Sequence, residues 1–497
     1  MDPAGGTSLL EESLRDLLAA APERGSLAPA SRLGAGEVAA ELARIQRNRA
    51  REAAREAELI LRLAELCPDA DDPRPGTPGA RRTWRRTEPE FAGVSEFFPD
   101  ELAHAINLGR GTAAFRARRA FTWRENLPAT FAALRSGRLD ERRAGVLADS
   151  LQHADPDLAR AVEAALLDEA STTAPAALRT RALALLAELD AAAVERRHRE
   201  AKKAADVRTY ETGDGMAALT TDLPADEAAA CYAMIDQLAR MAKADGDERP
   251  IGEIRSSIHS LLIRRPADSG LPGVGVQLAV TATLETLEGS SGRPGEVNGS
   301  VITAAQLRDL LRRVGALALT APDGGTLTFA LTDERGRLLA GLTAAELARL
   351  AARGCPDHPD AGEAGAGCEC PVSGPPPDTD AYTPTTAQHR FVDTRDRRCR
   401  MPNCGQRAGW ADHDHVVPHA RGGTTTCSNL CCLCRSHHRL KTFAPGWVFR
   451  MDDDGTLHVT SPSGVTRTTR PPGLRPRAPD PASADQAHVG AVDPPPF

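Results

Sequence analysis

The chain has 497 residues, and its 61 Lys and Arg are outnumbered by 68 Asp and Glu, so the whole protein is mildly acidic. This length is too great for one hydrophobic core and predicts two or three domains. The sequence shows no secretory signal and no apolar run near the roughly 20 residues that a membrane-spanning helix needs, so we expect a cytoplasmic, reduced protein without membrane contact.

Residues 1–80 are expected to hold two helices and a linker. A short amphipathic helix is predicted from Leu9 to Leu18, and a long one from Val38 to Leu66. Charged residues fill the middle of the long helix. It could therefore pair with another helix or another subunit, giving a homo-oligomer, or lie as an arm on its own domain. Residues 68–80 have the Pro, Gly and Asp content of a linker.

Residues 81–265 are predicted to form a helical domain, with a nearly all-helical pattern from about residue 96. Stretches rich in Ala and Leu follow one another with short turns at 127–134, 140–151, 156–167, 175–189, 226–244 and 251–263, with two strands at 207–212 and 216–223. The segments LPATFAALRSGRLDERRAGVLADS and DGMAALTTDLPADEAAACYAMIDQLAR resemble the helical domain of unknown function of the 13E12-repeat type. That resemblance covers roughly residues 30–350 and implies no catalytic residue.

In residues 266–353 the sequence pattern includes strands as well as helices, which predicts a small α/β bridge. Strands are expected at 274–284 and 326–332, and a helix at 303–313 is opened by a Thr-x-x-Gln capping box. A further helix is expected to begin at Thr343.

Residues 354–384 have the Gly and Pro content of a loop. This loop carries Cys355, His358, Cys368 and Cys370, which either form a second zinc clasp or have no joint role. A helix is predicted at 385–398, and the tail from 471 to 497 is expected to be disordered.

Residues 385–470 contain two pairs of metal-ligating residues with a second set of polar residues between and after them. The pairs are Cys399-x4-Cys404 and Cys434-x2-His437, a spacing typical of a closed tetrahedral zinc site. Nine of the 11 cysteines lie between 355 and 434, which indicates metal binding and not a disulfide framework. The surplus residues are an acid next to a His, an Asn and a further His: Asp414, His415, Asn429 and His438. These types suit metal-assisted phosphodiester hydrolysis.

The segments CRMPNC, HDHVVPHARGG, SNL and LCRSHHRLK resemble the HNH endonuclease family. The resemblance implies a ββα-metal fold (the HNH, or His-Me finger, module) stabilised by a structural Zn²⁺ ion on Cys399, Cys404, Cys434 and His437. It also implies catalytic roles for His415 as general base and for Asn429, which would fix the loop and the base or complete the metal shell. Asp414 and His438 would bind a catalytic divalent metal, Mg²⁺ or Mn²⁺.

Residues 389–470 hold 13 Lys and Arg against 7 Asp and Glu, a net charge of +6 on an acidic chain. A basic module of this kind favours a nucleic-acid partner. Such a run is often only a solvated face, but beside a phosphodiesterase motif we expect phosphate contacts from Arg395, Arg398, Arg400, Arg439 and Lys441.

The sequence thus predicts a mainly α protein with a small α/β bridge and a C-terminal HNH module. The expected function is metal-dependent cleavage of DNA phosphodiester bonds. The alternative is a zinc-dependent DNA-binding or interaction protein whose nuclease centre is inactive, and the sequence does not separate DNA from RNA as the substrate.

Overall fold

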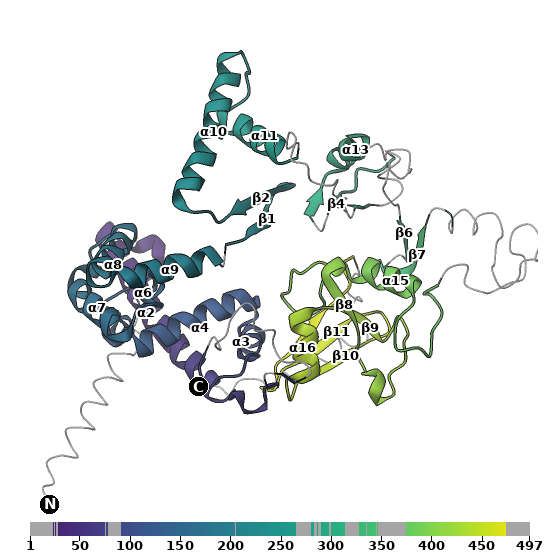
Figure 1. Cartoon of the computed structure of the whole chain (residues 1–497), viewed down its shortest axis with the longest axis horizontal. Coiled ribbons are helices and arrows are strands. Elements are labelled where there is room, and N and C mark those ends of the chain that lie inside the picture. Colours follow the sequence, from purple (N-terminus) through teal and green to yellow (C-terminus); the bar gives the residue numbers. More distant parts are fainter. Residues whose placement is uncertain are drawn as a thin grey trace, which may run out of the picture. The chain divides into compact units, whose positions relative to one another are not determined.

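The protein is described from a computed structural model of the whole chain (Figure 1). The residues that the structure describes are 28–74, 91–264, 280–282, 290–313, 328–343 and 374–473, without 204, 298, 299 and 334, together with 23, 25, 76, 77, 286 and 345. The helix predicted at Leu9 to Leu18, the four residues of the possible zinc clasp, the helix predicted after Thr343 and the tail from 474 onward lie outside these residues.

The chain divides into two compact units. The first comprises Met1–Gln152, Ala159–Arg179 and Thr328–Phe497, and the second comprises His153–Leu158 and Thr180–Leu327. The first unit therefore contains both the N-terminal helices and the segment with the Cys and His motifs. The predicted 266–353 bridge is divided between the two units.

Helices rich in alanine and leucine make up the first part of the first unit. They are α2 (Ala35–Glu65), α3 (Phe98–Ile106), α4 (Arg110–Glu125), α5 (Pro128–Ser136) and α6 (Glu141–Leu151), with 3₁₀ turns η1 (Ala30–Arg32) and η2 (Asp69–Asp71). In the chain they are followed by α7 (Pro156–Ala170) and α8 (Pro175–Leu189), whose residues are divided between the two units. Local signals set their ends: the Asp140 side chain accepts a hydrogen bond from Arg143 N at 3.1 Å and caps α6, and Gly137 ends α5 at φ +76°. The predicted helical character is confirmed.

Helix α2 packs on its own domain through its second half. The buried residues of this half, which face α4 and α5, are Ala50, Ala54, Ala57, Ile60, Leu61 and Ala64. Val38 and Leu42, in the first half, are exposed. The second half of α2 is therefore packed on its own domain, which was one of the two predicted alternatives. Pairing with another subunit to form a homo-oligomer stays a prediction.

The second unit consists of helices and small antiparallel sheets. Its elements are α9 (Ala191–Lys203), β1 (Val207–Gly213), β2 (Met216–Thr221), α10 (Ala225–Ala244), α11 (Ile251–Arg264), β3 (Val280–Thr281), β4 (Gly295–Val297), β5 (Ser300–Ile302) and α13 (Ala304–Arg313). Thr303 and Gln306 form the predicted capping box at the start of α13. None of the helices within the described ranges is long and apolar enough to cross a membrane.

The C-terminal part of the first unit places a two-stranded hairpin between two helices (Figure 1). Its elements are β6 (Thr328–Thr332), β7 (Leu338–Thr343), α15 (Thr386–Asp396), η3 (Ala408–Trp410), β8 (Ala411–His415), η4 (His419–Arg421), β9 (Leu430–Cys434), α16 (Arg435–Phe443), β10 (Val448–Met451), β11 (Leu457–Thr460) and β12 (Thr466–Thr469). Strands β8 and β9 are antiparallel, with His413 opposite Cys432 and Asp414 opposite Cys431.

Alternation along β9 builds a core on each side of the hairpin. Cys431 and Leu433 pack with Leu440 of α16, whereas Leu430 and Cys432 pack with Phe391 of α15. The hairpin is therefore covered on both faces, and each polar residue of β8 is directed toward one helix or the other.

Helix α3 completes the C-terminal core from more than 300 residues upstream. Phe97, which precedes it, belongs to the same core cluster as Leu440 and Val459. His104 Nε2 lies 3.1 Å from Val459 O, and Arg467 Nε donates to His104 O at 2.7 Å. The C-terminal segment is thus not independent of the helices that precede it.

Candidate metal centre and hydrolytic site

The structure brings Cys399, Cys404, Cys434 and His437 into one cluster whose ligand atoms all lie within 4.8 Å of one another. Cys399 follows the end of α15, and Cys404 closes a short turn in which its N–H donates to Met401 O at 3.1 Å. Cys434 is the N-cap of α16, which places His437 in the first turn. His437 Nδ1 lies 3.4 Å from Cys399 Sγ and 3.1 Å from Cys434 Sγ.

This cluster could hold a metal ion. Hydrogen bonds among the sulfurs raise the pKa of Cys399 and lower that of Cys434. Three sulfurs and one imidazole nitrogen form a closed, soft donor set of the kind that structural sites use.

A carboxylate from α3 lies behind His437. The Asp100 Oδ1 atom is 3.2 Å from His437 Nε2, and Asp100 is only 3% exposed. Arg110 donates to the other oxygen of Asp100 at 3.0 Å. A carboxylate on the outer nitrogen of a metal-ligating His orients the ring and raises its basicity.

A second polar site lies where β8 meets α16. His438 is held between two carboxylates of β8: its Nδ1 is 2.8 Å from Asp412 Oδ2, and its Nε2 is 3.6 Å from Asp414 Oδ1. The other oxygen of Asp414 pairs with Lys441 Nζ at 2.9 Å. If Nδ1–H donates to Asp412, the Nε2 lone pair of His438 faces Asp414, so these two residues could share a cation.

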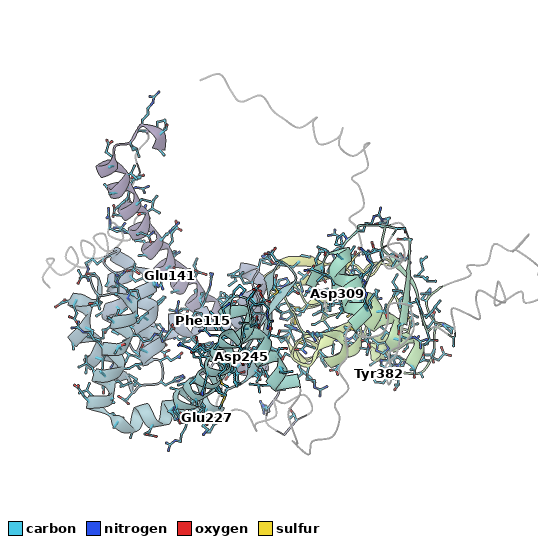
Figure 2. The ribbon with its side chains drawn as sticks, turned by 90° about the horizontal axis from the view of Figure 1, so that it is seen from above. Phe115, Glu141, Glu227, Asp245, Asp309 and Tyr382 are labelled. Atoms are coloured by element: carbon cyan, nitrogen blue, oxygen red, sulfur yellow. The ribbon has the colours of Figure 1, made fainter. Side chains whose placement is uncertain are left out.

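His415 ends β8 and is only 4% exposed. Its Nε2 lies 2.8 Å from Thr425 Oγ1, and Thr425 is itself fixed because its carbonyl accepts from Gln388 Nε2 at 2.8 Å. Burial lowers the pKa of His415 below its ordinary value. The Tyr382 side chain, labelled in Figure 2, stacks on the His415 ring at a centroid distance of 5.4 Å.

Asn429 fixes the loop that follows β8. Its side chain accepts from Val417 N at 2.8 Å, and it donates to Val417 O at 3.0 Å and to Thr424 O at 2.8 Å. Gly423 permits this close approach, because a Cβ there would lie 1.9 Å from Val417 O. These contacts fix the loop, and the expected roles of Asn429 in fixing the base or completing a metal shell stay predictions.

Four of the five residues expected to contact phosphate are engaged inside the protein. Arg395 and Arg400 are 7% and 2% exposed, and both pair with the fully buried Asp396, at 2.7 Å and 2.8 Å. Arg395 also donates to the carbonyls of Cys427 and Leu430, each at 2.6 Å. The prediction of DNA contact is therefore wrong for Arg395 and Arg400, because their guanidinium groups serve a buried network.

Of the other three residues expected to contact phosphate, two form ion pairs within the protein and one is exposed. Arg439 pairs with Glu96 at 2.7 Å, and Lys441 is occupied by Asp414, so neither presents a free cation to the surface. Arg398 is exposed, as its predicted role requires. Arg435 is also exposed and lies 3.4 Å from Asp412, which makes it a candidate that the sequence analysis did not name.

Asp100, Asp412 and Thr425 are the site residues that sequence reasoning missed. Asp412 stands two positions before a predicted ligand, so the alternation of a strand could have placed it on the face of Asp414. Asp100 is 337 positions from His437, and nothing in the local pattern around it indicates this contact.

The fold and the cluster together define a mainly helical protein with small antiparallel sheets and a Cys/His cluster near its C-terminus that could hold a metal ion. The chain belongs to the family described as Domain of unknown function (DUF222), which matches residues 39–333. The expected helical domain of unknown function is thereby confirmed. Asp100 lies within the matched region and His437 outside it.

Similar proteins occur in Mycobacterium tuberculosis. The chain is 47% identical to the uncharacterized protein Rv3776 over 90 residues, which are 18% of this chain and 17% of that protein. It is 46% identical to the uncharacterized proteins Rv2100 and MT2160 over 90 residues, 18% of this chain and 16% of each relative. The similarity thus spans about a sixth of the length of these relatives. No solved structure matches the chain significantly.

Proposed function

We propose that this protein is a metal-dependent HNH endonuclease that hydrolyses DNA phosphodiester bonds and leaves 5′-phosphate and 3′-hydroxyl ends. The observation that carries the proposal is the arrangement of β8, β9 and α16. This strand, strand and helix unit sets His415 beside Asp414 and brings His438 to 3.6 Å from Asp414, next to the Cys/His cluster.

His415 is the proposed general base. If its Nε2–H donates to Thr425 Oγ1, 2.8 Å away, the Nδ1 lone pair is left to take a proton from water. A buried imidazole with a lowered pKa is neutral near pH 7, the form that a base requires. Asn429 holds the loop after β8, and Lys441 donates to His415 O at 2.6 Å, so the backbone around the base is fixed from two sides.

Asp414 and His438 would hold a divalent cation, Mg²⁺ or Mn²⁺. When bound, such a cation supplies electrostatic stabilisation of the phosphate and of the departing 3′ oxygen. Asp412 positions His438 for this task by accepting its Nδ1–H. The donor set of Cys399, Cys404, Cys434 and His437 fits a structural Zn²⁺ ion, which would stabilise the turn before β8 and the start of α16.

The DNA backbone would be contacted by exposed arginines near this site. Arg398 and Arg435 are the proposed contacts, in place of the buried Arg395 and Arg400. A net charge of +6 on residues 389–470 supports an anionic partner for this part of the chain.

Plasmid cleavage tests the proposed function. Purified, zinc-loaded protein is expected to nick or linearise supercoiled DNA with Mg²⁺ or Mn²⁺, and the reaction should stop with EDTA and in His438→Ala. Gel electrophoresis of the plasmid forms gives the rate. Absence of cleavage by a folded protein, across both metals and with single-stranded and double-stranded DNA, would contradict the proposal.

The second candidate is a zinc-dependent DNA-binding or interaction protein with an inactive centre. Two observations favour it: Lys441 already neutralises Asp414, and Tyr382 covers the buried His415 ring. This candidate predicts salt-dependent DNA binding by the full chain without any metal-dependent cleavage, measured by fluorescence anisotropy beside the plasmid assay.

Asp100→Ala is expected to weaken zinc binding about 10- to 100-fold, because it removes the carboxylate behind His437. Competition with a chromophoric chelator measures the affinity. Glu101→Gln is the matched control: Glu101 is a buried carboxylate of the same helix, but it accepts from Ser463 N and not from His437. Equal zinc affinity in wild type and Asp100→Ala would show that α3 only packs against the cluster.

A further inference from the structure

A second group of metal-ligating side chains lies on the α15 face of the hairpin. Asp393 of α15, His413 of β8 and Cys432 of β9 offer one carboxylate oxygen, one ring nitrogen and one sulfur within 4.8 Å of one another. Asp393 Oδ1 is 2.8 Å from His413 Nε2 and 3.6 Å from Cys432 Sγ. The proposed nuclease chemistry uses none of these three residues.

The fold holds the three ligands in place from three different elements. His413 and Cys432 are directly opposite in the β8–β9 ladder, so their side chains point to the same face. Cys432 N–H donates to Asp396 Oδ2 at 2.9 Å, which ties this strand position to the end of α15. Cys432 is fully buried, the His413 side chain is 11% exposed, and that of Asp393 is 41% exposed.

His389 orients the ring of His413. The Nδ1 atoms of the two residues lie 2.7 Å apart, so one of them donates and the other accepts. If His413 donates through Nδ1–H, its Nε2 carries the lone pair and faces Asp393 and Cys432. A metal-ligating His commonly has its second nitrogen fixed in this way by an acceptor outside the ligand set.

We propose that Asp393, His413 and Cys432 bind a second zinc ion. Bonds of about 2.0–2.3 Å in a tetrahedral site set neighbouring ligand atoms roughly 3.3–3.8 Å apart. The 3.6 Å between Asp393 Oδ1 and Cys432 Sγ matches this spacing, and the 2.8 Å between Asp393 Oδ1 and His413 Nε2 would lengthen when the ion enters. The sulfur and nitrogen donors select zinc over Mg²⁺ and Ca²⁺, which prefer oxygen. The exposed side of Asp393 leaves the fourth position to water.

Such an ion would clamp α15 onto the hairpin from the face opposite α16. The Cys399 cluster joins the turn after α15 to the start of α16, and Cys399 and Cys432 belong to different core clusters. The two ions would therefore secure both sides of the segment that carries His415. The competing interpretation is a hydrogen-bonded chain from His389 through His413 to Asp393, without a metal.

Zinc content of the full chain decides between these interpretations. Wild type, Asp393→Asn and Cys432→Ala are purified with zinc, dialysed against metal-free buffer, and analysed by inductively coupled plasma mass spectrometry. We expect both variants to contain about one equivalent less than wild type. Comparison with wild type cancels any zinc held elsewhere in the chain. Cys427→Ala is the matched control, because Cys427 is a buried thiol of the same core cluster that is not a member of this ligand set, and its content should equal that of wild type.

Unchanged zinc content in Asp393→Asn and in Cys432→Ala would overturn the proposal. If Cys432→Ala fails to fold, Asp393→Asn decides the question alone, because its side chain is 41% exposed and the change preserves shape. Cobalt substitution gives a second readout: wild type should show more thiolate-to-cobalt charge-transfer absorption at saturation than folded Cys432→Ala, whereas equal absorption would also overturn the proposal.

Discussion

His415→Ala is expected to lower the rate of metal-dependent DNA cleavage between about 100-fold and 10,000-fold, the range that a positioned general base contributes. The change removes the imidazole that follows Asp414 in the chain and is hydrogen-bonded to Thr425. DNA affinity should change little, since His415 is 4% exposed and neutral. Single-turnover plasmid cleavage and fluorescence anisotropy measure the two quantities separately.

His419→Ala is the matched control for this prediction. Its ring lies 5.6 Å from that of His415, so the variant removes a neighbouring imidazole without touching the Thr425 hydrogen bond. We expect it to cleave within a few-fold of wild type, with both variants folded by circular dichroism. Equal cleavage by wild type and His415→Ala would assign the activity to a contaminant or place the base elsewhere.

The local features of this fold could be predicted because their causes are local. The helix at 140–151 is fixed by Asp140 at its N-cap, and the helix before Cys399 begins with a capping box of Thr385 and Gln388. The four ligands of the Cys/His cluster were found for the same reason: two pairs at short spacing need only one turn each. The structure places these pairs together.

The roles of the arginines could not be predicted, because a charge run does not show which way each side chain points. The sequence suggests that Arg395 and Arg400 lie on a basic surface. Inside the core, however, the Asp396 carboxylate lies between them and accepts hydrogen bonds from both. Burial by itself raises the pKa of Asp396, but the two guanidinium groups outweigh it and hold this pKa below its ordinary value. The ion pairs, not the solvent, therefore decide where these arginines lie.

Long-range pairing is the other feature that sequence reasoning missed. Contacts such as Asp100 with His437 and Glu96 with Arg439 join segments more than 300 residues apart. No repeating pattern of residues in the sequence indicates such contacts. They bring a helix of the family-matched region into the core of the C-terminal segment. The segment with the Cys/His cluster and the helical region should consequently be studied as one folded unit, not as separable domains.

Cys434→Ser is expected to unfold the C-terminal segment. Structural zinc contributes an apparent binding free energy of about 10–16 kcal/mol, as large as the whole stability of a typical domain at about 5–15 kcal/mol. Cys434 is a ligand of the cluster and directly precedes the first residue of α16, so its loss as a ligand affects the cluster and the start of the helix that carries His438. Near-ultraviolet circular dichroism and limited proteolysis should show loss of ordered packing from residue 385 onward.

The outcome of this experiment separates stabilisation by zinc from stabilisation by the core. Cys427→Ala removes a thiol that is more buried than that of Cys434 but lies in the core cluster with Phe391, so it should cost only a small cavity, about 1 kcal/mol, and stay folded. Because Phe97, which directly precedes α3, belongs to the same core as Leu440, α3 should also lose protection in Cys434→Ser, which hydrogen exchange can detect at Phe98–Ile106. A folded, protease-resistant Cys434→Ser protein would mean that packing against α3 holds the segment without the metal.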